Sequence, residues 1–176
     1  MAEAEKIRVC GHNNATYGPV PKDEQLFSVE FLEIAPTPIT ADRVVFLYLH
    51  GWIPSETPSL NIKSPDLGLI NATLKLSSSA KFPDGSSDPS KSLTIPFKST
   101  IFNNAAHLVI RDESGKQVDY MPTTGGDVLL DFDFRIPRIF LRTGEWTFQV
   151  DARLGDEGDT CLFAFESVQW LEGEKS

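Results

Sequence analysis

The sequence VLLDFDFRI at residues 128–136 decides the fold class. Every second residue is apolar, namely Val128, Leu130, Phe132, Phe134 and Ile136. Between them stand mostly charged residues, and successive side chains of a β-strand point to opposite faces, so this segment predicts a strand with one buried face. Residues 146–154, WTFQVDARL, alternate in the same way after the turn signal Thr143-Gly144 and predict a second strand.

The rest of the chain continues this all-β pattern. Twelve Gly and twelve Pro separate short apolar segments, without long stretches at helical spacing. Further strands are expected at 27–34, 43–52, 70–76, 93–97, 108–111, 117–121 and 161–171. Residues 44–49 and 162–165 are apolar at every position, which suits central strands covered on both sides or strands with a bulge, so their facing cannot be assigned.

The segments between and around these strands are polar. Residues 81–92, KFPDGSSDPSKS, read as a polar connection, 1–25 as an N-terminal arm and 173–176 as a C-terminal tail. We therefore expect one domain over 1–176, an immunoglobulin-like β-sandwich of two antiparallel sheets.

Composition excludes several classes of function. The 176 residues include 25 acidic and 16 basic side chains, and the net charge of −9 repels nucleic acids. No stretch approaches the ~20 apolar residues of a membrane span. Residues 1–25 lack the apolar segment of a secretion signal, so an exported form is expected to have lost its signal before Met1.

Few side chains suggest chemistry. Neither a CxxC nor an HxxxH spacing for zinc nor a GxSxG nucleophile motif occurs. The acidic groups at 131–133 and 156–159 read as solvated surface, and His12, His50 and His107 as structural or solvated residues. We expect no enzyme, cofactor or metal. A lipid-handling enzyme that pairs His50 or His107 with a nearby carboxylate is the least supported alternative.

The two cysteines leave the compartment open. Cys10 and Cys161 would be unrelated reduced thiols in the cytosol and a bonded pair in an exported protein. Asn14 and Asn71 begin glycosylation tripeptides, which favour export only weakly because such patterns arise often by chance.

The inward faces of the expected strands carry much apolar surface. These side chains either interdigitate into a solid core or line a cavity between sheets that stand apart. The crystal-like density of protein interiors favours the solid core on residues alone. A cavity lined this way would select lipid tails, because it offers apolar burial and few hydrogen bonds.

The order of landmarks resembles the ML-domain lipid-recognition family. The resemblance rests on Cys10-Gly11, FSVEFLEIAPTPI at 27–39, VVFLYLHGWIP at 44–54, DFDFRIPRIF at 131–140 and TGEWTFQVDARLGDEGDTCLF at 143–163. It covers most of the chain and is loose over residues 61–121. Members are exported or lumenal β-sandwiches that hold a lipid between their sheets.

The resemblance implies a bond between Cys10 and Cys161 and a pocket mouth at Ile136, Pro137, Ile139 and Phe140. The chain departs from the family in lacking cysteines for further disulfides and in the polar insertion at 81–92. The C-terminal part is also similar to the Rho-GDP-dissociation inhibitors, cytosolic sandwiches that hold a prenyl group.

The leading hypothesis is a non-enzymatic carrier of a sterol, phospholipid or other hydrophobic ligand. Such a carrier is expected to be monomeric, to touch membranes transiently, and to be secreted or lumenal if the cysteines pair and cytoplasmic otherwise. The expected ligand-contacting residues are Leu74, Leu76, Ile95, Phe97, Leu130, Phe132, Phe134, Ile136, Ile139, Phe140, Trp146, Phe148 and Val150. The alternative from another class is an immunoglobulin-like interaction module with a solid core, which binds its partners through loops.

Overall fold

The computed structural model describes residues 14–18, 20–53, 71–101, 106–121, 127–137, 141–154 and 161–173. The strands are β1 (Asn14–Thr16), β2 (Ser28–Ala35), β3 (Ile39–Thr40), β4 (Val44–Trp52), β5 (Thr73–Lys81), β6 (Ser87–Pro96), β7 (Thr100–Ile101), β8 (Ala106–Arg111), β9 (Gln117–Val118), β10 (Asp127–Arg135), β11 (Gly144–Arg153) and β12 (Cys161–Glu172). A single 3-10 turn, η1 (Lys22–Glu24), joins them within these ranges. None of the described segments is a helix long and apolar enough to cross a bilayer.

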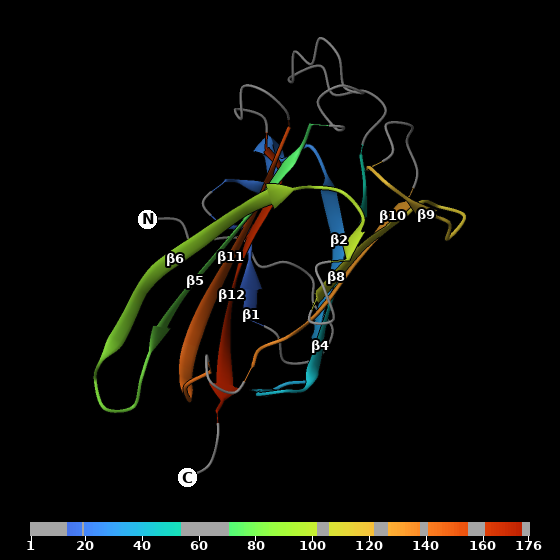
Figure 1. Ribbon diagram of the computed structural model, residues 1–176. Helices are drawn as coiled ribbons and strands as arrows, with labels where there is room; N and C mark the ends of the chain where they lie inside the picture. Colours follow the sequence, from blue (N-terminus) through green and yellow to red (C-terminus); the bar gives the residue numbers. More distant parts are fainter. Residues whose placement is uncertain are drawn as a thin grey trace.

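The strands form two facing sheets (Figure 1). Sheet A has the order β1-β12-β11-β5-β6, and β3 pairs with β12 as well. Sheet B has the order β2-β4-β10-β8-β7, and β9 pairs with β8. All pairings are antiparallel except the short β3–β12 pair. The predicted all-β sandwich is confirmed.

The Pro-x-Pro step carries the chain from one sheet to the other. Pro36 and Pro38, both after cis peptide bonds, stand between β2 of sheet B and β3 of sheet A. The short β3 then lies beside the end of β12, where Ile39 is opposite Leu171.

Two separate groups of buried side chains pack between the sheets. The larger group includes Phe163, whose ring centroid lies 5.8 Å from that of Phe27 and 5.7 Å from that of Phe97. The smaller group contains Ile39 and Leu171 near the opposite end of β12. Packed apolar side chains therefore join the two sheets near each end of β12.

The two best alternating segments form the expected strands. Residues 128–135 lie in β10, where Val128 and Leu130 are buried, and residues 146–153 lie in β11. The uniformly apolar segment 162–165 is confirmed as a strand covered on both sides, because all four residues are at most 3% exposed.

The polar segment 81–92 was wrongly expected to be a connection over its whole length. The connection covers only 82–86, and β6 already begins at Ser87. Nearly every residue of β6 is exposed, because this strand forms the edge of sheet A. A strand without a buried face shows no apolar alternation, which explains the error.

Part of the expected N-terminal arm belongs to the sandwich. β1 pairs with β12, and the Gln25 side chain is buried against the same strand. Gln25 Nε2 donates a hydrogen bond to the Ala164 carbonyl at 2.9 Å, and the Ala164 amide donates to Gln25 Oε1 at 3.0 Å. Together with the bonds from the Leu26 and Phe27 amides to the Cys161 and Leu162 carbonyls, these two hydrogen bonds hold the segment before β2 along the edge of β12.

Candidate functional site

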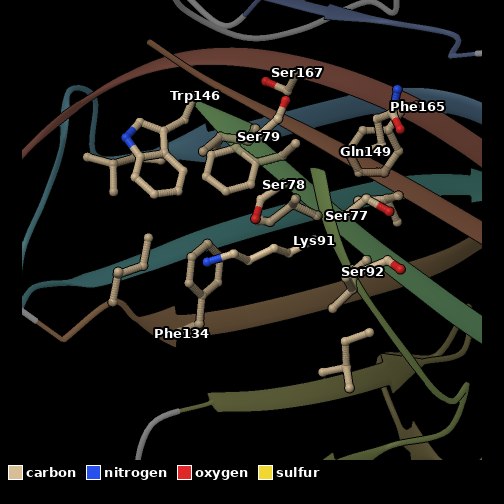
Figure 2. Close-up of a pocket in the computed structure, with 18 of the residues that line it drawn as sticks. Ser77, Ser78, Ser79, Lys91, Ser92, Phe134, Trp146, Gln149, Phe165 and Ser167 are labelled. Atoms are coloured by element: carbon tan, nitrogen blue, oxygen red, sulfur yellow. The ribbon is translucent and has the colours of Figure 1, made fainter. Parts of the chain in front are cut away.

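A cavity of about 560 Å³ lies between the two sheets, beside the larger buried group (Figure 2). Its apolar lining comes from both layers: Ile34, Leu47, Phe132 and Phe134 from sheet B, Ile39, Leu76, Leu93, Trp146, Phe148, Val150 and Phe165 from sheet A, and Ile136 after β10. This volume is within the ~300–1,000 Å³ typical of small-molecule sites. The interior therefore contains both a packed core and a hollow.

Strand register brings the lining residues of each sheet into rows. In sheet A one row crosses β5, β11 and β12 through Leu76, Val150 and Phe165. In sheet B a row crosses β2, β4 and β10 through Ile34, Leu47 and Phe132. Each row presents a continuous apolar surface, because residues opposite each other in neighbouring strands point to the same face.

Aromatic rings form much of the two facing walls. Trp146 and Phe148 of β11 stack with ring centroids 6.3 Å apart and an angle of 15° between their planes. Phe132 and Phe134 of β10 lie 5.3 Å apart on the opposite wall. Trp146 Nε1 donates a hydrogen bond to the Arg142 carbonyl at 2.9 Å, which fixes the indole ring. The walls offer flat apolar surface to a bound molecule.

One side of the cavity, along β5 and β6, is polar. Ser77, Ser78, Ser79, Asp88, Lys91 and Ser92 belong to its lining (Figure 2). Lys91 and Ser78 are opposite each other in the β5–β6 pairing and continue the row that contains Phe148 and Ser167. Ser167 itself is fully buried and accepts a hydrogen bond from Gln169 Nε2 at 2.8 Å. The cavity is thus amphipathic, with an ammonium group and hydroxyl groups on the side of the exposed β6 edge.

The structure brings seven of the thirteen expected ligand-contacting residues together in the lining. They are Leu76, Phe132, Phe134, Ile136, Trp146, Phe148 and Val150. Leu74, Phe97 and Leu130 lie in the larger buried group, and Ile95 packs against it. Leu74, Ile95 and Leu130 lie on strands and Phe97 directly follows β6, in the part of the sandwich that the larger buried group occupies. Ile139 and Phe140 lie outside the described residues.

Sequence reasoning missed other parts of the lining. Leu47 and Phe165 lie in the two strands whose facing the sequence could not assign. The polar residues of β5 and β6 fell in or next to the segment expected to be a connection. Their place beside the cavity could be recognised only once β6 was known to be a strand paired with β5.

The histidines of the described residues lie away from the cavity, on the outer face of sheet B. His107 Nδ1 is 2.7 Å from Asp133 Oδ1, and the two residues are opposite each other in β8 and β10. His50 Nδ1 lies 3.3 Å from Glu30 Oε2. Neither histidine belongs to the cavity lining, so the placement gives no support to a lipid-handling enzyme. His12 and the acidic group at 156–159 lie outside the described residues.

The same outer face contains one carboxylate in an unfavourable environment. Asp131 Oδ1 is buried and makes no hydrogen bond within the described residues. Burial, and secondarily the negative charge of Asp133, raises the pKa of Asp131 above its ordinary value. Burial likewise raises the pKa of Tyr48, the neighbour of Asp131 on β4. The environment of Asp131 therefore favours its protonated form more than water does.

The remaining expected positions are only partly described. Cys161 is buried, and burial raises the pKa of its thiol to about 12, while Cys10 lies outside the described residues. The bond between them stays a prediction. Asn71 is exposed just before β5, and Asn14 begins β1; glycosylation of either residue stays a prediction.

Comparison with known proteins adds no assignment. No protein-family model matches the chain, and no curated protein sequence matches it significantly.

Proposed function

We propose that the protein is a non-enzymatic carrier that holds a hydrophobic ligand, such as a sterol or phospholipid, between its two sheets. The observation that supports the proposal is the cavity of about 560 Å³ lined by aromatic and aliphatic side chains of both sheets. This cavity favours a carrier over an interaction module, for which a solid core was expected. The apolar walls favour a ligand through burial, at ~25 cal/mol for each Å² removed from water.

The polar side of the cavity suggests how such a ligand is oriented. Hydrocarbon or rings would lie against Trp146, Phe148, Phe132 and Phe134, and a polar end would lie near Lys91 at the β6 edge. This orientation avoids burying the polar end, which would be costly without hydrogen bonds.

Direct detection of a bound molecule tests the proposal. Native mass spectrometry of the purified protein is expected to show a co-purified lipid, identified after extraction. Delipidated protein is expected to bind an NBD-labelled sterol, an NBD-labelled phospholipid or a geranylgeranylated cysteine with saturation. The prenyl ligand distinguishes a prenyl carrier from a sterol or phospholipid carrier. Failure of every ligand class would refute the proposal.

The proposed compartment depends on the cysteines. We propose export or a lumenal location if Cys10 and Cys161 are bonded. Thiol titration of protein denatured without reductant should then find no free thiol. Two free thiols would instead indicate a reducing compartment and leave the carrier proposal untouched.

A further inference from the structure

A second cluster of polar side chains lies on the outer face of sheet B, apart from the cavity. It joins Glu30 of β2, His50 of β4 and Asp127 of β10, three neighbouring strands. Glu30 Oε2 is 3.3 Å from His50 Nδ1, and Asp127 Oδ2 is 3.8 Å from His50 Nε2. One donor atom from each residue lies within 4.8 Å of the other two. Within the described part of the chain, no second histidine, cysteine or carboxylate group meets this condition.

A β-bulge aims Glu30 at the histidine. Val29 is opposite Gly51 and Phe31 is opposite His50, which leaves Glu30 as an extra residue in β2. The inward residues on either side are Val29 and Leu32, 8% and 0% exposed, so two consecutive residues point outward between them. In a regular strand only one of the two would share the face of His50. Bulges commonly re-aim a side chain in this way, and they are frequent next to functional sites.

The donor set suits a divalent transition metal. Two carboxylates and a neutral imidazole bring a charge of −2 and combine nitrogen with oxygen ligands, a set that Zn²⁺ accepts. With metal–ligand bonds of about 2.0–2.1 Å, neighbouring donors of a tetrahedral site are about 3.4 Å apart. The 3.3 Å between Glu30 Oε2 and His50 Nδ1 is close to this spacing before any ion is bound. The 3.8 Å distance from Asp127 Oδ2 runs to the other ring nitrogen, Nε2.

Exposure lets the site adjust. The Asp127 side chain is 62% exposed, against 45% for Glu30 and 34% for His50. An ion binds only one ring nitrogen of His50, so one carboxylate must turn toward that nitrogen, and Asp127 has the room to do so. Water can complete the coordination on the solvent side.

We propose that Glu30, His50 and Asp127 form a binding site for a divalent transition-metal ion, with Zn²⁺ as the probe that fits best. The bound ion would connect β2, β4 and β10 across the outer face of sheet B. The proposal does not depend on the cavity or its ligand. It also explains why no metal motif is visible in the sequence, since the ligands come from positions 30, 50 and 127.

Metal titration of the full chain tests this site. The protein is stripped with EDTA, dialysed, and titrated with Zn²⁺ by calorimetry and with Co²⁺ by absorption spectroscopy. Mutation of a residue that only hydrogen-bonds a metal ligand typically lowers metal affinity about 10–100-fold. We therefore expect His50→Gln, Glu30→Gln and Asp127→Asn each to raise the Kd of one bound Zn²⁺ per chain by at least about tenfold. Zn²⁺ should also raise the Tm of the original protein and not that of His50→Gln.

The matched control is His107→Gln. His107 also lies on the outer face of sheet B beside a carboxylate, 2.7 Å from Asp133, but is not part of the three-residue group. Its substitution should leave Zn²⁺ affinity unchanged. Circular dichroism shows whether each variant is folded. The proposal is overturned if the original protein binds no Zn²⁺ at 1 mM, or if folded His50→Gln binds it as tightly as the original.

Discussion

Substitution of Val150 by Trp should reduce ligand binding far more than it reduces folding stability. Val150 lies in the middle of the sheet A wall, between Leu76 and Phe165. The indole would project into a cavity of about 560 Å³, so it has room that a filled core would not offer. Its folding cost should therefore be below the ~1–3 kcal/mol typical of overpacking.

The effect on binding follows from the surface that the indole covers. If the ligand loses about 100 Å² of apolar contact, its affinity falls by about 2.5 kcal/mol at 25 cal/mol per Å², which is a roughly 60-fold higher Kd. The assay is titration of delipidated protein with an NBD-labelled ligand, followed at the NBD emission. Native mass spectrometry of the unextracted variant should show a matching loss of co-purified lipid.

The matched control is Thr147→Trp. Thr147 is also β-branched and lies on β11, but it points to the opposite face and is not part of the cavity lining. This variant should bind the ligand as the original protein does. An unchanged Kd for folded Val150→Trp, or an equal loss in both variants, would refute the assignment of the ligand to this cavity.

Three further substitutions test the packing outside the cavity. Phe97→Ala should lower the free energy of unfolding by about 3–5 kcal/mol in urea titrations, because Phe97 is 1% exposed in the packed core. The same substitution should change the ligand Kd less than about threefold. A large loss of affinity would contradict the separation of core and cavity. Gly51→Ala should cost at least about 1–3 kcal/mol, because its Cβ would overlap the backbone oxygen of Ser28, and a neutral effect in the same titration would argue against this close approach of β2 and β4. Asp131→Asn should raise the Tm at pH 7, since the folded state disfavours the charged carboxylate. Because the pKa of Asp131 is raised in the folded state, the protein with aspartate loses stability as the pH rises above 3.8, the ordinary pKa of aspartate. The gain in Tm of Asp131→Asn should therefore vanish below about pH 4. A gain that persists below this pH would point to another cause.

The sequence predicted the architecture because alternation is a local signal. Residues 128–135 and 146–153 each carry it complete, and both became central strands. The signal is lost where a strand has no buried face, as in β6, or two covered faces, as in β12. In these strands only the pairing partners show which side chains point inward.

The candidate site was harder to predict from the sequence than the fold, for a related reason. The sequence identifies Phe148 or Val150 as inward, but the distance between the sheets depends on how many side chains of the opposite layer reach across. Leu130 and Phe132 illustrate this, since they are neighbours on the same face of β10 and yet one lies in the core and the other lines the cavity. The Glu30–His50–Asp127 group was invisible because a bulge and two strand pairings bring distant positions together.

The exposed edge of sheet A at β6 affects the tendency of the protein to aggregate at high concentration. The free side of an edge strand offers backbone hydrogen-bonding groups that can recruit a strand from another molecule and begin fibril growth. In this strand Pro89 has no amide hydrogen to donate, and Lys91 brings a charge that a neighbouring copy would have to bury or repel. Pro89 and Lys91 thus oppose the addition of another strand to the β5–β6 hairpin, although this hairpin forms one side of the apolar cavity.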